Sequence, residues 1–224
     1  MKRSEINCHI EEAIAFCREH YFGLPPFAYW SPREWETKGH EYDEIRDCML
    51  GWDVTDYGSG DFAHVGLLLF TLRNGNMQME RYTKRYCQKL LLTGENHYTP
   101  YHFHFSKTED IICQAGGDLL VQVYNADAEQ RLADTPVPVM TDGYWHEVPA
   151  GTVIRLHPGD SITLPPYQYH QFWAEGGMAL VVEVSAVNDD RSDNRFLEKV
   201  VRLATPEADA EPLHLLCTEY PPAP

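Results

Sequence analysis

The chain has 224 residues, of which 43% are hydrophobic and 23% are charged, as in an ordinary globular protein of one domain with or without an extension. Its 34 acidic and 18 basic residues give a formal net charge of −16 at pH 7. This acidic balance argues against nucleic acid or an anionic membrane as the main partner, because both require a basic surface.

The N-terminal quarter of the chain has helical patterns. Apolar residues at helical spacing over 6–21, with Ser4 as the expected N-cap, predict a helix that packs on the outside of the main body. A capping box that begins at Ser31 predicts a second helix from Pro32. Helical character resumes over 41–50.

Beyond the helical segment the pattern changes to short strands. The expected strands fall at 65–72, 77–82, 86–93, 100–106, 110–114, 118–124, 137–140, 144–148, 152–156, 161–164, 170–174 and 178–186. Turn residues separate them about every 8 to 12 positions, with Asn74-Gly75 as a hairpin turn and Gly116-Gly117 as a break. This spacing predicts a mainly β sandwich or barrel rather than βαβ units. We expect a helical extension at 1–59 packed on a β-barrel at 60–204, with a surface tail at 205–224.

The cysteines and the N-terminus indicate the compartment. Six cysteines are spread along the chain without a CxxC pair, which is typical of reduced thiols in a cytoplasmic protein. The N-terminal segment has charges through its apolar stretch and no small-residue cleavage site, so we expect neither a signal peptide nor an anchor. No run approaches the ~18 apolar residues of a transmembrane helix. We therefore expect a cytoplasmic protein that does not bind a membrane.

The stretch from Pro100 to Gly117 contains a candidate metal site. On a strand, His102 and His104 point to the same face, and Glu109 follows shortly after them. His170 stands after a Pro-rich turn, from which a barrel can bring it to the first pair. Three imidazoles and a carboxylate suit Mn, Fe, Co, Ni or Zn, and they leave two positions of an octahedral ion open. For each histidine taken alone, a hydrogen-bonded role in a turn or core is the alternative.

The spacing of these residues resembles the two motifs of the cupin superfamily. The likeness is carried by His102, His104, Glu109 and Gly116 for the first motif, and by Gly159, Pro165 and His170 for the second. The second motif departs from the common pattern, because Gln168 and Tyr169 stand where a glycine is usual and Trp173 stands near the place of the closing asparagine. The resemblance implies a cupin-type β-barrel, or jelly roll, over residues 60–187.

A longer likeness is to the D-lyxose isomerase family of cupins. It is carried by HFHFSKTEDII at 102–112, QKLL at 88–91, VNDDR at 187–191 and DNRF at 193–196. The resemblance implies a manganese-dependent aldose–ketose isomerase, which acts on D-lyxose and D-xylulose and often on D-mannose and D-fructose. It also implies a homodimer with a small-molecule sugar as its substrate.

Such an isomerase moves a proton between C1 and C2, so it needs a base that is not held as a metal ligand. Glu183 is the candidate, because an acid inside an apolar strand is costly unless it is paired or functional, and it shares a face with Val181 and Ser185. The alternative for Glu183 is a salt bridge to a lysine on a neighbouring strand, or a position facing solvent. Lys107 can donate to the sugar carbonyl or a hydroxyl, and its alternative is a solvated turn lysine.

Three further residues are candidates for substrate binding. Lys89 lies in a strand, where it either pairs with Glu183 or faces water. Asp190 and Arg191 follow the strand of Glu183, where they can form a polar lid over the substrate or remain a solvated loop.

Three other functions remain open. A cupin-type phosphosugar isomerase would need a cluster of phosphate-binding donors, and no Gly-rich phosphate loop or paired-arginine motif is evident. A cupin iron dioxygenase would use the same ligands. A sugar-binding cupin without turnover would lack an ordered acid or base near the metal.

Overall fold

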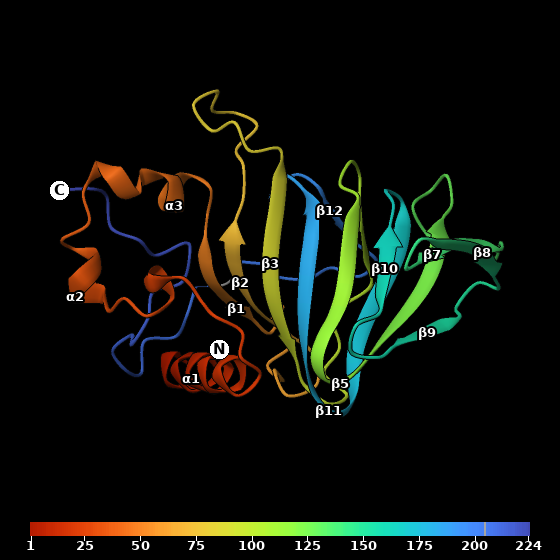
Figure 1. Ribbon diagram of the computed structural model, residues 1–224, viewed down its shortest axis with the longest axis horizontal. Coiled ribbons are helices and arrows are strands. Elements are labelled where there is room, and N and C mark those ends of the chain that lie inside the picture. The colour runs from red at the N-terminus through yellow and green to blue at the C-terminus, as the bar shows by residue number, and fades with distance from the viewer. Residues whose placement is uncertain (204) are drawn as a thin grey trace.

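In the computed structural model, which describes residues 1–203 and 205–224, a twelve-stranded antiparallel sheet carries short helices on one flank (Figure 1). The helical segments are α1 (Arg3–Glu19), η1 (Pro26–Ala28), α2 (Pro32–Trp35), η2 (His40–Tyr42) and α3 (Asp43–Asp47). The strands are β1 (Gly51–Thr55), β2 (Leu67–Arg73), β3 (Tyr86–Thr93), β4 (His102–His104), β5 (Glu109–Ala126), β6 (Leu132–Ala133), β7 (Val137–Thr141), β8 (Tyr144–Val148), β9 (Val153–Leu156), β10 (Ser161–Leu164), β11 (Gln168–Ala186) and β12 (Asn194–Phe196). The architecture is mainly β, as the spacing of short strands predicted.

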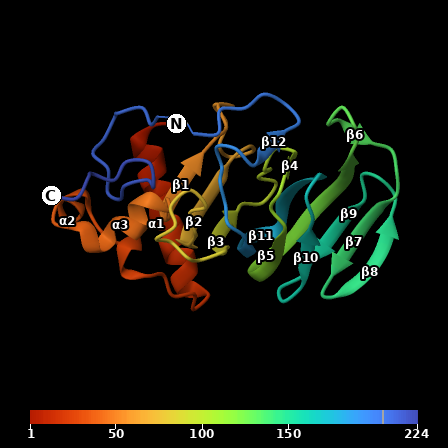
Figure 2. The same ribbon diagram turned by 90° about the horizontal axis from the view of Figure 1, so that it is seen from above.

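The sheet follows a jelly-roll arrangement of the cupin type. Its hydrogen-bonded path runs β1-β2-β3-β11-β5-β10-β7-β8, and in the described residues this path does not close on itself. The strands β4, β6, β9 and β12 join from the side, and Figure 2 shows β4 and β12 side by side, apart from the main row. Apolar side chains from β2, β3, β5, β7, β10 and β11 converge on one internal core, and the candidate site lies at the edge of this core.

Two long strands organise the fold. β5 and β11 pair with each other over most of their length, from Gln168 opposite Asn125 to Ser185 opposite Glu109. The expectation that Gly116-Gly117 ends a strand is wrong, because β5 continues through both residues. Gly116 adopts φ +85°, and a Cβ there would lie only 2.2 Å from the Met178 carbonyl oxygen, so glycine allows the paired strands to bend past each other.

The helix α1 covers the outer face of the sheet. Ile6 and Ile10 pack with Trp52, Phe70 and Leu90 in a second apolar cluster, which lies between the helix and the sheet. The expected N-cap was wrong, because the helix is capped at Lys2 and the Ser4 hydroxyl instead donates to Asp209. The expected capping box at Ser31 is present at the start of α2.

The connection after β2 differs from the expected tight hairpin. Residues 77–82 do not form a strand, and the strand that returns along β2 after the loop is β3. The reason is that the Asn74 side chain is used in tertiary contacts: its amide donates to the carbonyls of Cys48 and Asn188, and its oxygen accepts from the Asn188 N–H. Residues 74–85 form a projecting loop (Figure 1).

The sheet also recruits both ends of the chain. The first strand, Gly51–Thr55, lies within the segment expected to be helical. In the segment expected to be a surface tail, Leu216 and Cys217 are buried, and the Cys217 N–H donates to the Trp52 carbonyl. None of the helices in the described part of the chain is long and apolar enough to cross a membrane.

Candidate metal centre and catalytic cavity

Four side chains of the predicted metal set come together inside the sheet. His102 and His104 lie on β4, Glu109 begins β5, and His170 lies on β11 directly opposite His102 in the strand register. Each of the four offers one donor atom, and these atoms all lie within 4.8 Å of one another. His170 Nε2 is 3.1 Å from both Glu109 Oε1 and His102 Nε2, and His104 Nε2 is 3.4 Å from the same carboxylate oxygen.

Backbone carbonyls orient all three imidazoles. Nδ1 of His102 donates to the Pro100 carbonyl at 2.8 Å, and Nδ1 of His104 and of His170 donate to carbonyls at 3.1 Å. This tautomer leaves each Nε2 with a lone pair that faces the centre of the cluster. Burial, together with His170 and His104, holds the pKa of His102 well below its usual value, so this ring is neutral.

These contacts test whether a cation fits the cluster. Nε2 of His102 and Nε2 of His170 lie 3.1 Å apart, and their lone pairs repel each other unless a positive group lies between them. Three imidazoles and a carboxylate form a donor set that suits a divalent first-row metal without selecting which one. The cluster can therefore hold a metal ion.

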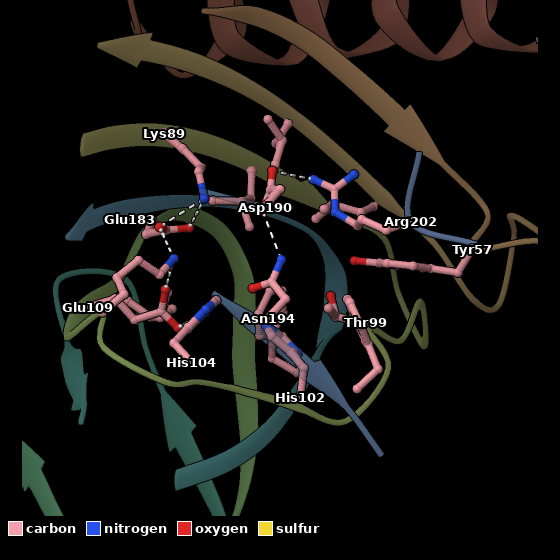
Figure 3. A pocket seen from close by; sticks show the side chains of 17 residues that line it. Tyr57, Lys89, Thr99, His102, His104, Glu109, Glu183, Asp190, Asn194 and Arg202 are labelled. Carbon is pink, nitrogen blue, oxygen red and sulfur yellow. Dashed lines mark hydrogen bonds and ion pairs between the residues drawn. The ribbon is translucent and has the colours of Figure 1, made fainter. Parts of the chain in front are cut away.

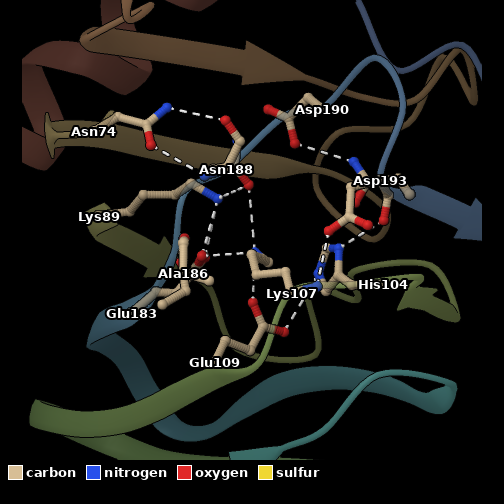
Figure 4. A network of polar contacts seen from close by, with 12 residues as sticks. Asn74, Lys89, His104, Lys107, Glu109, Glu183, Ala186, Asn188, Asp190 and Asp193 are labelled. Atoms are coloured by element: carbon tan, nitrogen blue, oxygen red, sulfur yellow. Dashed lines mark hydrogen bonds and ion pairs between the residues drawn. The ribbon is translucent and has the colours of Figure 1, made fainter. Parts of the chain in front are cut away.

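A buried network of lysines and carboxylates adjoins the cluster (Figure 4). Lys107 Nζ lies between two carboxylates, 2.6 Å from Glu109 Oε2 and 2.7 Å from Glu183 Oε1. Lys89 Nζ, on the neighbouring strand β3, is 3.0 Å from Glu183 Oε1, and Asn188 Oδ1 accepts from both lysines. Glu183 thus faces the interior, and it also makes the salt bridge that was the alternative to a catalytic role.

The lysines keep the Glu183 carboxyl ionised. Burial alone raises its pKa, but the ammonium groups of Lys107 and Lys89 more than offset burial, and the pKa lies below its usual value. For Lys107, burial lowers the pKa, while the Glu109 and Glu183 carboxylates raise it above its usual value. Lys107 is therefore a charged hydrogen-bond donor and a weak acid.

Asp193 holds the turn that carries Lys107. Its carboxylate accepts from the N–H and hydroxyl of Ser106, both at 2.8 Å, and from the Lys107 N–H at 3.0 Å. Its backbone carbonyl accepts from His104 Nδ1. One residue of the segment after β11 therefore orients both a candidate ligand and a candidate catalytic lysine.

The cavity beside the cluster extends to a second polar region (Figure 3). Arg202 Nη2 lies 2.7 Å from Asp53 Oδ2 and 3.0 Å from Asp190 Oδ2, and the Asn194 amide donates to the other Asp190 oxygen. Burial raises the pKa of Asp190, but Arg202 reverses that effect and holds the carboxyl well below its usual range. The guanidinium charge of Arg202 is in turn balanced by two carboxylates.

The structure brings most of the predicted residues together. Lys89, Lys107, Glu183 and Asp190 all line the cavity beside the metal cluster, whereas Arg191 is exposed and lines a neighbouring cavity.

Sequence reasoning missed other residues that line this cavity, namely Tyr57, Thr99, Asn194, Phe196 and Arg202. Of these, only Asn194 and Phe196 lay in a segment, residues 193–196, that carried a recognisable pattern.

Comparisons with known proteins find relatives over nearly the whole chain. A family model described as D-lyxose isomerase matches residues 1–220. The chain is 46% identical to the D-lyxose/D-mannose isomerase of Serratia proteamaculans and 44% identical to that of Escherichia coli O157:H7, over 223 residues and 98% of each chain. The solved structure of Cellulomonas parahominis L-ribose isomerase with L-ribose shares 18% identity, with a TM-score of 0.59 over 92% of this chain and 98% of that one. At that identity, the structural likeness shows a shared fold.

Proposed function

This chain belongs to the D-lyxose isomerase family of aldose–ketose isomerases, and on that premise we propose that it converts D-lyxose to D-xylulose and D-mannose to D-fructose. We further propose a cytoplasmic homodimer that uses Mn²⁺. The names of the two full-length relatives support the pair of substrates. The family resemblance supports the metal and the dimer.

One observation carries the proposal. Glu183 is a buried carboxylate outside the four-ligand set, it lines the same cavity as His102, His104 and Glu109 of that set, and two lysines hold it ionised. A sugar-binding protein without turnover has no need to keep an unliganded base beside its metal, whereas proton transfer between C1 and C2 requires one.

The metal ligands have a limited and defined role. His102, His104, Glu109 and His170 would hold the ion with Nε2 and carboxylate oxygen atoms. When bound, a divalent ion there supplies a Lewis acid that stabilises negative charge on the sugar oxygens at C1 and C2.

The residues around Glu183 then perform the proton transfer. The Glu183 carboxylate takes the proton from C2 of the aldose, which gives an enediolate with its charge on O1. The O2 hydroxyl proton passes to O1, and the protonated Glu183 returns its proton to C1 as the carbonyl forms at C2. Lys107 donates a hydrogen bond to the oxygen on which negative charge develops, since its raised pKa makes it a poor proton donor. Lys89 fixes the orientation of Glu183 through both carboxylate oxygens.

Substrate contact is assigned by position. Lys89 and Asp190 line the cavity, so we retain both as candidate contacts with the sugar hydroxyls. Arg191 is exposed and lines the neighbouring cavity, and we leave it out of the proposed substrate-binding set.

The charge balance of the cavity favours a free sugar over a phosphosugar. Lys89, Lys107 and Arg202 are the cationic side chains that line it among the described residues, and each already contacts carboxylates. A phosphate group would have to compete with those partners, whereas uncharged hydroxyls would not.

A metal-titrated isomerase screen tests the proposed function. Metal-free protein is loaded with Mn²⁺, Co²⁺, Ni²⁺, Zn²⁺ or Fe²⁺ and incubated with free pentoses and hexoses and their phosphates, and the ketose formed is measured. We expect turnover of D-lyxose and D-mannose that depends on the added metal. Turnover of phosphosugars alone, or oxygen consumption by the iron-loaded protein without isomerisation, would overturn the proposal.

A further inference from the structure

Two buried residues present side-chain hydroxyls to the cavity for which the described residues supply no hydrogen-bond partner. Tyr57 is 5% exposed and Thr99 is 3% exposed, and both line the cavity. Across residues 1–203 and 205–224, no contact is found for the Tyr57 hydroxyl or for Thr99 Oγ1, although the backbone N–H of each residue donates a hydrogen bond. Figure 3 shows the Tyr57 hydroxyl pointing into the pocket, with Thr99 beside it. Neither oxygen is among the fully buried side-chain atoms that lack a partner in the described residues, so both hydroxyls are accessible from the cavity and can pair with a molecule that fills it.

The carboxylates of the cavity differ in this respect. Glu183 accepts from two lysines, and Asp190 accepts from Asn194 and Arg202. These carboxylates are paired within the protein, whereas Arg202 Nη1 is buried without a hydrogen-bond partner in the described residues. The hydroxyls of Tyr57 and Thr99 are therefore uncharged groups of the cavity wall that are accessible and free to pair with a ligand, and Arg202 Nη1 lies near them as a further unpaired donor.

Their position relative to the metal cluster is set by Phe196. Its ring stacks on His102 with centroids 5.4 Å apart, and it lies 5.6 Å from the ring of Tyr57. The ring of Phe196 thus neighbours both Tyr57 and the candidate metal ligand His102. In Figure 3, Tyr57 and Thr99 lie on the side of the pocket away from Glu109 and Glu183. A five- or six-carbon chain with its C1–C2 end at the cluster would extend toward them.

The turn after β1 holds Tyr57 in place. Tyr57 has φ 55°, a left-handed conformation that is rare for an aromatic residue. The Thr55 hydroxyl accepts from the Tyr57 N–H, the Asp56 carboxylate accepts from the N–H groups of Gly58 and Gly60, and the Tyr57 carbonyl accepts from the Val201 N–H. The fold therefore fixes the tyrosine ring toward the cavity.

We propose that Tyr57 and Thr99 form a subsite for the sugar hydroxyls remote from C1 and C2, at C4 or C5, and so determine which sugars bind productively. A hydroxyl both donates and accepts, so two protein hydroxyls match two sugar hydroxyls without any charge. Arg202 lies next to this subsite, but Asp53 and Asp190 balance its charge, so the distal end suits a hydroxyl better than a phosphate. The assignment rests on the proposed function for the placement of C1 and C2.

The test combines hydroxyl deletions in the protein with deletions in the sugar. Tyr57→Phe and Thr99→Val remove one hydroxyl each with little change of shape. With Mn²⁺-loaded protein, we expect each variant to raise KM for D-lyxose about 10-fold with kcat changed less, and to keep metal content and thermal stability unchanged. Wild type should lose a similar factor with 4-deoxy- or 5-deoxy-D-lyxose, and the matching variant should no longer distinguish that analogue from D-lyxose.

Tyr220→Phe is the matched control. Its hydroxyl donates to the Leu50 carbonyl at 2.9 Å, outside the cavity, so its loss should lower stability and leave KM unchanged. If wild type converts D-lyxose and both variants keep its KM and its preference for D-lyxose over the two deoxy sugars, the subsite assignment is wrong. The proposed function would then still stand.

Binding measured by calorimetry separates the remaining outcomes. If wild type binds D-lyxose without turnover, the proposed function fails, and a roughly 10-fold loss of affinity in Tyr57→Phe still supports the subsite. If Mn²⁺-loaded wild type neither binds nor converts any free pentose or hexose, both proposals are wrong.

Discussion

Replacing Lys107 by methionine should destabilise the metal-free protein strongly. Lys107 Nζ is 2.6 Å from Glu109 and 2.7 Å from Glu183, and its side chain is only 2% exposed. Lys107→Met would leave two buried carboxylates without a shared cation. Removing one partner of a buried ion pair costs on the order of 3–5 kcal/mol in the free energy of unfolding, and we expect a loss in that range.

The metal state should change the size of this loss. A divalent cation at the cluster compensates the Glu109 carboxylate, so the penalty should be smaller in Mn²⁺-loaded protein. Because the variant also removes a positive charge next to the ion, its affinity for Mn²⁺ should not fall, although kcat should. Urea unfolding of metal-free and Mn²⁺-loaded protein measures the first effect, and a metal titration measures the second.

Lys84→Met is the matched control for the charge change. Lys84 also pairs with a carboxylate, that of Glu44, but both side chains are about one-third or more exposed, so its loss should cost at most about 1 kcal/mol. If Lys107→Met were no more destabilising than Lys84→Met, or if it lost Mn²⁺ affinity, the role given to Lys107 between the two carboxylates would be wrong.

Two further predictions concern single histidines. His104→Ala should lower bound metal and isomerase activity together, and full metal content by elemental analysis would exclude His104 as a ligand. Burial, helped by His9 and His64, lowers the pKa of His97 to about 4, below the usual value of about 6.5. The stability it contributes as a neutral ring is therefore complete above pH about 6.5 and is lost as the pH falls toward 4, by up to about 3 kcal/mol. Urea unfolding measures the free energy of unfolding of metal-free wild type and of His97→Gln at several pH values in this range. As the pH falls, the advantage of wild type should shrink or reverse, and a difference that does not depend on pH would contradict the prediction.

The sequence predicted the metal cluster because its members follow local rules. His102 and His104 share a strand face by alternation, and Glu109 and His170 stand in motif positions. Glu183 was recognisable as an acid in an apolar strand, and its partner Lys89 lies directly opposite it in the register of β3 and β11. Short-range patterns of this kind can be predicted because the geometry of a strand itself determines which side chains share a face.

The rest of the site depends on how distant segments cross. Arg202 reaches the cavity because residues 201–202 dock against the first strand and the turn after it. The Val201 N–H donates to the Tyr57 carbonyl, and the Arg202 side chain donates to the Asp53 carboxylate. Nothing in the residues around Arg202 or Thr99 has a period or a motif that indicates this path. For the same reason Asn74 was taken for a turn residue, although its side chain binds the Asn188 backbone across the fold.

The central claim is that Glu183 moves the proton, and Glu183→Gln tests it most directly. With Mn²⁺-loaded protein in deuterated water, both the conversion of D-lyxose and the entry of deuterium into the product should be measured, beside metal content and sugar affinity. We predict that the variant binds metal and D-lyxose within a few-fold of wild type and loses about 10²–10⁴-fold in turnover, with deuterium exchange lost in parallel. Isomerisation at the wild-type rate by Glu183→Gln would contradict the claim.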